Sequence, residues 1–332
     1  MMITPLHSDA FCSSIEIALM NPPDLNNSLA RIHSSLNRLP NGNLYASVEN
    51  GRVSFITIID GKRKYISKKS TQIYSLARRR YQTTLFDILK LSGSNKDRDI
   101  VRRAKLIANL QKFICICEQG NLDIARIVLT GSQYKWFTGN FRQKPIDKEK
   151  ATFTAGGLPV RSKSERDIVN TYDDFAVPLH YEEQQVIYVK HLVDQLHEDL
   201  SSSGFWGKGN NAGIGQLYDF RGSYIHWNVP AELEWMNARG SIWKTYYPPR
   251  GTITIHTDIK TMLADSSIFL HEHEGMMDKF IYRFNASERS SILKYTGTVR
   301  PENFLETYEQ DVDTSEKRQT IIESRVLPRL WF

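Results

Sequence analysis

The chain has 332 residues, 40% of them hydrophobic and 24% charged, a composition typical of a folded globular protein that excludes a disordered one. No run approaches the ~18 apolar residues of a membrane span. The first residues lack the basic start and apolar core of a secretory signal. Three cysteines, Cys12, Cys115 and Cys117, fit neither a disulfide framework nor a tetrahedral zinc site. We therefore expect a cytoplasmic protein without membrane contact.

The net charge of +6 hides an asymmetry along the chain. Residues 1–150 carry 24 Lys and Arg against 12 Asp and Glu, and the remainder carries 19 against 25. The balance is therefore +12 in the first part and −6 in the second. A basic half is typical of a protein that meets phosphate backbones, although a solvated basic surface explains it equally well. An acidic half suits a domain that gathers carboxylates around a metal ion.

The N-terminal part predicts a small antiparallel meander among helices. Residues 1–40 are polar, with one short helix near Leu29–Leu39. Asn50-Gly51 and Asp60-Gly61 are strong hairpin signals between short β-like runs. The three predicted strands are Leu44–Val48, Arg52–Ile59 and Lys64–Ser67. Apolar periodicity then predicts helices at Thr71–Leu91, Arg98–Glu118 and Asn121–Leu129.

A basic cluster accompanies the first of these long helices. Arg78, Arg79 and Arg80 lie partly opposite its apolar stripe, and Lys68 and Lys69 precede it. Such a cluster is more often a solvated helix face than a DNA contact. The balance of +12 nevertheless favours nucleic-acid binding, so these five residues are the candidates for it.

Beyond residue 150 the pattern alternates strands and helices. Residues 131–160 are rich in loops, and Thr154–Pro159 is the best candidate for a domain boundary. Ser162–Phe175 predicts a helix in which Ser162 is the N-cap and Glu165 completes a capping box. The predicted strands are Leu179–Val186, Gly222–Trp227, Thr252–Met262, Ile268–His273 and Phe304–Tyr308. Further helices are predicted at Val189–Leu200, Met277–Tyr295 and Thr314–Val326.

Two acidic residues lie on neighbouring predicted strands. Asp258 closes one β-like run, and Glu272 lies on the next, just before a Gly turn. Carboxylates about a dozen residues apart on a hairpin converge naturally on one ion. Magnesium held by two or three carboxylates keeps waters in its shell, as phosphodiester hydrolysis requires. Strand alternation places Glu272 and Glu274 on one face, with His271 and His273 on the other.

Each acid also has a plain structural explanation. Capping-box spacing alone accounts for Glu165, and Asp258 could be an ordinary turn residue. The alternating charge from His271 to Glu274 is compatible with an edge strand. It is also compatible with a zinc site to which His256 adds a ligand.

At these residues the chain resembles the PD-(D/E)xK superfamily of nucleases. Arg161-Ser-Lys-Ser-Glu165, followed by Pro178-Leu-His-Tyr-Glu182, looks like the entry to their nuclease domains. His256-Thr-Asp258 stands where those proteins have a Pro-Asp step. The segment His271-Glu-His-Glu-Gly-Met-Met-Asp278 is similar to their Trp-Glu-His-x-Gly-Met-Met-Asp segment.

The resemblance implies a catalytic site as well as a fold. The fold is α/β: a restriction-endonuclease-like mixed sheet of four to five strands flanked by helices, with the site at one sheet edge. The implied ligands of Mg²⁺ or Mn²⁺ are Asp258, Glu272 and Glu165. The superfamily's Lys, two residues after the second acid, is Glu274 here. The positive group that replaces it would be one of His273, Lys260 or Lys279.

We therefore expect two parts with different tasks. Residues 1–150 form a basic region of meander and helices, and residues 155–332 a nuclease-like domain with an insertion at about 188–250. The expected activity is metal-dependent endonucleolytic hydrolysis of DNA, in phage defence or mobile-element biology, by a homodimer if both strands are cut. Two alternatives remain open: a catalytically silent binding module on the same fold, and an RNA- or nucleotide-regulated nuclease.

Overall fold

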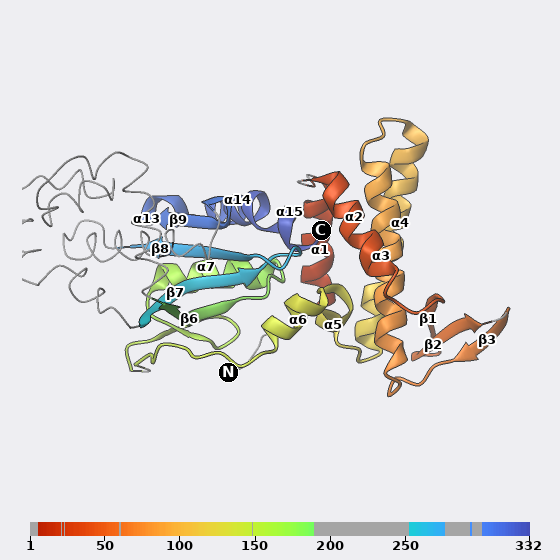
Figure 1. Cartoon of the computed structure of the whole chain (residues 1–332), viewed down its shortest axis with the longest axis horizontal. Coiled ribbons are helices and arrows are strands. Elements are labelled where there is room, and N and C mark those ends of the chain that lie inside the picture. The colour runs from red at the N-terminus through yellow and green to blue at the C-terminus, as the bar shows by residue number, and fades with distance from the viewer. Residues whose placement is uncertain are drawn as a thin grey trace, which may run out of the picture.

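The computed structural model describes residues 6–188 except 21, 23, 60 and 148, residues 252–275, residue 293, and residues 301–332. Within these residues, helices and three sheets form an α/β arrangement. In Figure 1 the N-terminal helices and a small meander lie at one end, beside a four-stranded sheet. The predicted helices Val189–Leu200 and Met277–Tyr295, the strand Gly222–Trp227, the insertion and Lys279 lie outside the described residues.

The predicted meander is present in the N-terminal half. Its strands are β1 (Leu44–Glu49), β2 (Arg52–Ile59) and β3 (Lys62–Tyr65), paired antiparallel in the order β1-β2-β3. Asn50 and Gly51 both have positive φ, of 53° and 73°, as a two-residue hairpin turn requires. Leu44 and Phe55 are buried on one face of this sheet. A Cβ at Gly120 would lie 2.6 Å from the Phe55 ring, so this close approach needs glycine.

Six helices are described in the same half. They are α1 (Ser8–Met20), α2 (Leu25–Leu36), α3 (Gln72–Ser92), α4 (Asp97–Gln119), α5 (Ile124–Val128) and α6 (Gly131–Phe137). The predicted apolar stripe of α3 is buried, with Ile73, Leu76, Ala77, Tyr81, Leu85, Ile88 and Leu89 in the core. No described helix combines the length and the apolar character that a membrane span needs.

The three consecutive arginines of α3 tie neighbouring elements together. Arg78 donates to two carbonyls at the end of α5 at 2.7 and 2.6 Å, and Arg79 to two at the end of α2 at 3.1 Å. Arg80 donates to the Leu44 carbonyl at 2.6 Å and stacks on Phe113. Each guanidinium thus satisfies backbone carbonyls that the ends of helices and strands leave open. This structural task was not anticipated from the sequence, whereas Lys68 and Lys69 are exposed as a DNA-contacting role would require.

The described part of the second half is organised around a mixed sheet of four strands. They are β6 (His180–Tyr188), β7 (Thr252–Met262), β8 (Ile268–Glu274) and β9 (Phe304–Tyr308), in the order β6-β7-β8-β9. The first three pair antiparallel, and β9 runs parallel to β8. The short strands β4 (Thr152–Phe153) and β5 (Pro159–Val160) form a hairpin that leads into α7 (Lys163–Asp174).

Helix α7 packs against the C-terminal helices. After the 3₁₀ turn η2 (Pro301–Asn303) and β9 come α13 (Glu309–Val312), α14 (Ser315–Arg325) and α15 (Leu327–Leu330). Helices α13 and α14 contact α7. The first turn of α7 lies close to the sheet, since Glu165 accepts from the hydroxyl of Tyr181 on β6 at 3.1 Å.

The end of the chain returns to the N-terminal helices. The indole N–H of Trp331 donates to Ser14 Oγ at 2.7 Å, and α15 packs on α1. Gln133 of α6 donates to the carbonyls of Met262 and Leu330 at 3.0 and 2.9 Å. The buried apolar side chains of both halves consequently form one core.

Candidate metal centre

Three carboxylates from three different elements converge beside the sheet. Glu165 of α7, Glu182 of β6 and Asp258 of β7 each offer an oxygen, and these atoms lie within 4.8 Å of one another. Glu182 and Asp258 are only 2% and 4% exposed. Buried carboxylates at this spacing repel one another unless a cation lies between them. A set of hard oxygen donors fits Mg²⁺ or Mn²⁺.

The first turn of α7 holds Glu165 in place. The predicted capping box is confirmed: Ser162 Oγ accepts from the Glu165 N–H, and Glu165 Oε2 accepts from the Ser162 N–H at 2.8 Å. The same oxygen also accepts from the Arg161 N–H and the Tyr181 hydroxyl, each at 3.1 Å. Because all three donors act on Oε2, a cation can bind Oε1 without displacing them. Capping and metal binding are therefore compatible roles for Glu165.

Glu182 occupies a distorted position in β6. Its φ is +52°, in the left-handed region that a residue with a Cβ rarely adopts. The residues on either side pair regularly with β7, and their register places Glu182 opposite Asp258. The Glu182 carbonyl accepts instead from the N–H of Lys144, at 3.1 Å. Such a conformation costs about 1–3 kcal/mol and is concentrated at functional sites.

The surroundings of Glu182 disfavour its negative charge. Burial raises its pKa to about 7, and Asp258 adds to the rise, while Arg161 and Lys144 oppose it. Arg161 Nε lies 3.0 Å from Glu182 Oε1, and the Arg161 side chain is one-third exposed. The cluster therefore attracts positive charge, and one guanidinium already lies against it.

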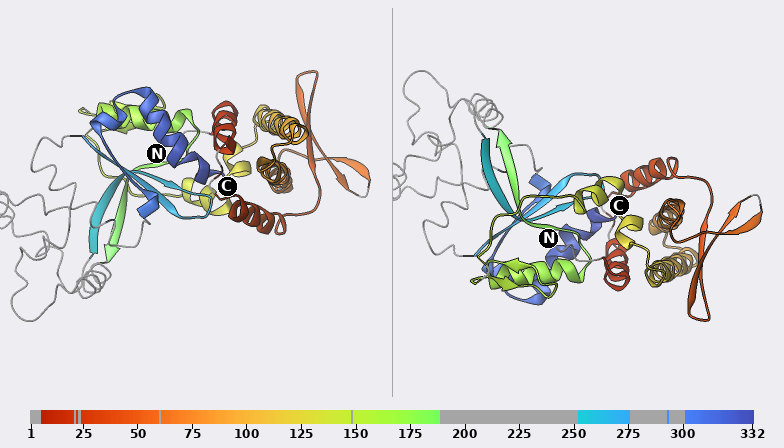
Figure 2. Two further views of the ribbon diagram at one scale, coloured as in Figure 1. Left: turned by 90° about the horizontal axis from the view of Figure 1, so that it is seen from above. Right: turned by 90° about the horizontal axis from the view of Figure 1, so that it is seen from below.

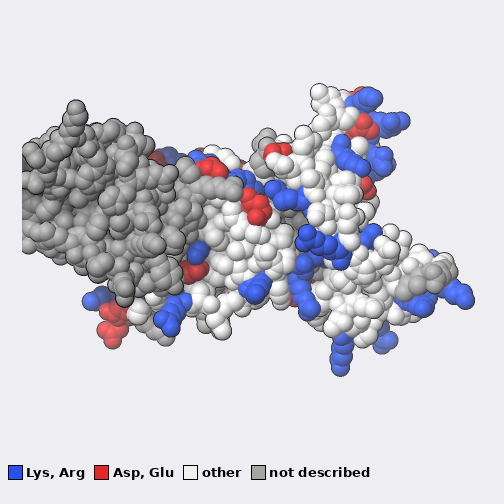
Figure 3. Space-filling view, in the orientation of Figure 1, with Lys and Arg blue, Asp and Glu red and all other residues white. Residues whose placement is uncertain are grey.

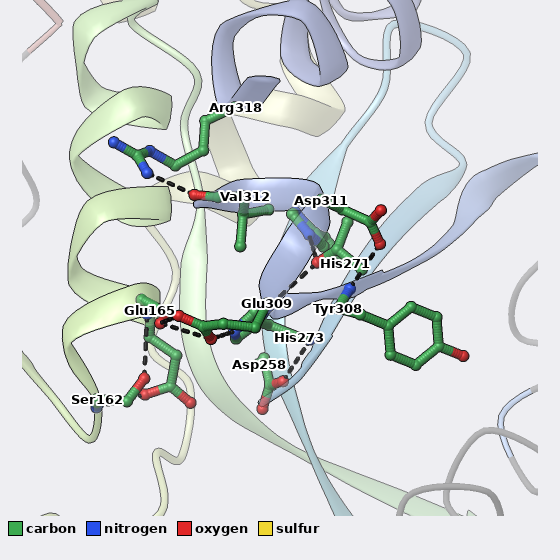
Figure 4. A network of polar contacts seen from close by, with 12 residues as sticks. Ser162, Glu165, Asp258, His271, His273, Tyr308, Glu309, Asp311, Val312 and Arg318 are labelled. Carbon is green, nitrogen blue, oxygen red and sulfur yellow. Dashed lines mark hydrogen bonds and ion pairs between the residues drawn. The ribbon is translucent and has the colours of Figure 1, made fainter. Parts of the chain in front are cut away.

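Asp258 and Glu272 interact across the gap between β7 and β8. The regular ladder of these strands runs from Met262 and Ile268 to Ile259 and His271. Just beyond it, the Asp258 N–H donates to Glu272 Oε1 at 3.2 Å. In the other direction, the His273 N–H donates to Asp258 Oδ2 at 2.8 Å, as Figure 4 shows. Where the strands diverge, side-chain oxygens thus accept from the N–H groups in place of backbone carbonyls. The contact with the His273 N–H also fixes the orientation of the Asp258 carboxylate.

The structure therefore brings together two of the three predicted ligands and places the third beside them. Glu165 and Asp258 belong to the cluster, and Glu182 is its third member. Glu272 is completely buried and holds the Asp258 backbone. Glu182 was present in the sequence motif but was not assigned a role. Its position opposite Asp258 follows from the strand register of the folded sheet, which no local sequence pattern reveals.

Lys260, one of the predicted positive groups, lies in a separate buried network. Its ammonium is 2.8 Å from Glu183 Oε1, and Glu183 Oε2 is 2.6 Å from His180 Nδ1. Although burial raises the pKa of Glu183, contacts with His180 and Lys260 bring it below its usual value. The His180 ring is stacked between Trp136 and Phe141, with both centroids at 3.9 Å. The charge of Lys260 is thus committed to holding β6 against β7.

His273 lies with its ring among side chains of β9 and α13. Nδ1 is 3.3 Å from Thr307 Oγ1, and Nε2 is 3.3 Å from Glu309 Oε2. Glu309 also accepts from Ser164 Oγ at 2.7 Å, so it bridges α7 and β8. His273 contacts the carboxylate cluster through its backbone N–H, which donates to Asp258.

The alternative of a histidine-based zinc site does not assemble among the described residues. The ring of His271 is buried between the Tyr172 hydroxyl at 3.1 Å and Thr307 Oγ1 at 2.8 Å. Burial lowers its pKa to about 3, with His273 as a further cause, so it is neutral. In the described part of the chain, the group with metal-binding spacing consists of carboxylates alone.

The fold and the site together define an α/β protein with a carboxylate cluster of metal-binding geometry. Comparison with protein-family models, with curated proteins and with solved structures gives no match to this chain. The functional interpretation therefore rests on the arrangement of the residues themselves.

Proposed function

We propose that the chain is a Mg²⁺- or Mn²⁺-dependent nuclease that hydrolyses phosphodiester bonds in DNA. The observation that carries this proposal is the convergence of Glu165, Glu182 and Asp258. The succession of α7, three antiparallel strands and a parallel fourth strand supports a restriction-endonuclease-like domain. The basic first half supports a polyanionic substrate.

The three carboxylates would hold the metal, and Glu272 and His273 would keep Asp258 oriented. When bound, the metal supplies charge neutralisation at the scissile phosphate and activates water. Arg161 is the protein's own cation at this place, 3.0 Å from Glu182. Its planar guanidinium can donate two hydrogen bonds to a phosphate oxygen pair. In this proposal Arg161, rather than Lys260, takes the part of the superfamily's Lys.

A plasmid cleavage assay with Mg²⁺ or Mn²⁺ tests the function and the site separately. We expect the wild type to nick DNA, and Asp258→Asn and Glu182→Gln to lose roughly 100-fold or more, since groups that merely orient metal ligands already contribute ~10–100-fold. Glu316→Gln, the same change on the exposed face of α14, is the matched control and keeps full activity. A wild type that cuts nothing with either metal defeats the proposal. Variants that cut like the wild type defeat the site assignment.

A catalytically silent binding module is the second candidate, because Glu274 stands where the superfamily has Lys. Titration calorimetry with Mn²⁺ separates the two. A silent module gives no binding heat, and Asp258→Ala changes nothing. The proposed enzyme gives a heat that Asp258→Ala abolishes. A parallel panel of DNA and RNA substrates shows whether RNA is cut instead.

A further inference from the structure

The β1-β2-β3 meander presents one face to the protein and one face outward. Figure 2 shows the sheet extending away from the N-terminal helices. Leu44, Phe55 and Thr57 are buried on the inner face. Because side chains alternate along a strand, the residues between them point to the other side. On that other side, Arg80 of α3 lies over the Tyr45 ring at 5.6 Å, while the part of the face on β2 and β3 that holds Ile58 and Tyr65 is exposed.

The outward face combines aromatic, aliphatic and basic side chains. Tyr45, Ile56 and Tyr65 are direct cross-strand neighbours on the three strands, and Ile58 pairs with Arg63. Tyr65 is 79% exposed, Tyr45 44% and Ile58 42%. Exposed apolar side chains gathered in this way are typical of an interaction surface.

The charge around this face favours a polyanion as its partner. Residues 44–70 carry six Lys and Arg against two acidic residues. Figure 3 shows basic side chains gathered over the meander and the adjoining helices. Protein interfaces, in contrast, are depleted in Lys. The outer strand β3 reads Lys62-Arg-Lys-Tyr65 and is exposed throughout, and such a charged edge opposes pairing with a strand of another chain.

The dimensions of the outer hairpin β2-β3 fit a groove of duplex DNA. Its two strands lie ~4.8 Å apart, so with the width of both backbones the hairpin spans roughly 10 Å. The major groove of B-DNA is about 12 Å wide and accepts a two-stranded β-ribbon. The major groove of A-form RNA is deep and narrow and excludes it. Size therefore selects duplex DNA over duplex RNA.

We propose that the outward face of the meander inserts into the major groove of duplex DNA. Arg63 and Tyr65 would contact base edges, and the exposed Lys68 and Lys69 would contact flanking phosphates. This inference rests on the proposed function for DNA as the partner. It adds the surface that would position the nuclease on its substrate and read the sequence.

Adjacent residues of β3 provide a matched test. Arg63→Glu and Lys64→Glu change the charge equally, one residue apart, on opposite faces of the same strand. Fluorescence anisotropy of a labelled DNA duplex is measured with the full chain in EDTA, so that no cleavage intervenes. We expect Arg63→Glu to weaken binding at least roughly fivefold more than Lys64→Glu, because only Arg63 would reach the bases. Tyr65→Ala leaves the charge unchanged and, at 79% exposure, removes little packing; it should also weaken binding.

Other results of the binding measurements overturn the inference. Equal losses of DNA affinity for Arg63→Glu and Lys64→Glu indicate general electrostatic attraction. If no variant loses affinity, the meander is not the DNA-binding surface. Duplex RNA that competes as well as DNA excludes groove insertion. A second copy as occupant would appear as a dimer in sedimentation that Tyr65→Ala dissociates without changing DNA affinity. If the protein binds DNA but never cuts it, only the nuclease proposal fails. If all three meander variants bind DNA with unchanged affinity and cut it equally well, only this inference fails.

Discussion

The backbone N–H of Asp258 donates to Glu272 Oε1 at 3.2 Å, where β7 and β8 cease to pair regularly. The sequence predicted both residues as equal metal ligands. The structure gives them different positions, because Asp258 belongs to the three-carboxylate group whereas Glu272 acts on the backbone of Asp258. A hydrogen bond of this kind orients a ligand before any ion arrives, which lowers the entropic cost of binding.

The role of Glu272 can be read from two substitutions. In Glu272→Gln the amide oxygen still accepts the Asp258 N–H, so we expect Mn²⁺ affinity to fall less than tenfold. Glu272→Ala removes the acceptor, and we expect a loss of ~10–100-fold, as for other groups that orient ligands. Calorimetric titration of both variants measures this. If Glu272→Gln abolishes binding as completely as Asp258→Asn, Glu272 is itself a ligand, as the resemblance implied.

The acidic cluster should lower the stability of the metal-free protein. Above pH 7 the buried carboxylate of Glu182, with its raised pKa, is ionised beside Asp258. Glu182→Gln removes that charge, so we expect the free energy of unfolding in EDTA at pH 8 to rise by roughly 1–2 kcal/mol. The wild type should gain stability from Mn²⁺, about 2.7 kcal/mol at 100 times Kd, and the variant should gain none.

Thermal unfolding with EDTA and with Mn²⁺ checks both parts of this prediction. Glu316→Gln, at an exposed position on α14, should behave as the wild type in both conditions. A Glu182→Gln variant that is less stable in EDTA would mean that the Arg161 contact outweighs the repulsion. A variant that keeps its stabilisation by Mn²⁺ would remove Glu182 from the site.

Lys260 should prove to be structural. Lys260→Met leaves the buried Glu183 with His180 alone and should cost about 3 kcal/mol, the usual penalty of breaking a buried pair. The double variant Lys260→Met with Glu183→Gln removes both charges and should recover most of that stability and the cleavage activity. Urea unfolding and the plasmid assay measure the two. A double variant that is stable but inactive would restore Lys260 to the catalytic role expected from the sequence.

Much of the fold could be predicted because local patterns and tertiary structure agree. The strands Thr252–Met262 and Phe304–Tyr308 were predicted at the bounds that the structure shows. Helix α1 was missed, although Phe11, Ile15, Ala18 and Leu19 recur at helical spacing; Ser8 and Ser14 on the same buried face weaken that apolar signal. Those serines bind partners remote in the chain, Glu118 and Trp331, which no local pattern contains.

The site was predictable only in part, for a similar reason. Glu165 and Asp258 stand in recognisable motifs, whereas the role of Glu182 depends on its positive φ. In a regular strand Glu183 and His180 would lie on opposite faces, yet their side chains are 2.6 Å apart. Glu182 lies between them, and its left-handed backbone shifts the alternation of side chains so that both of these side chains lie on the same face. A conformation of this kind is imposed by the surrounding structure and leaves no periodic signal in the sequence.

A last prediction concerns pH and an acid outside the cluster. Asp173 lies in the final turn of α7, next to Asp174, where the helix dipole disfavours negative charge. Burial raises the pKa of Asp173 to about 6, and Asp174 adds to the rise. The native state therefore binds the proton more tightly than the unfolded chain. The stabilisation from protonated Asp173 is complete below about pH 4 and is lost as the pH rises through 6.

Asp173→Asn should accordingly stabilise the protein at pH 7.5, by roughly 1–2 kcal/mol once partial exposure is allowed for, and much less at pH 4.5. Urea unfolding of both proteins at the two pH values measures the difference, from which the titrating groups that do not interact with Asp173 cancel. Asp174→Asn, at the exposed neighbouring position, should give a smaller gain. A gain for Asp173→Asn that is equal at both pH values would show that helix propensity, rather than the buried charge, is responsible.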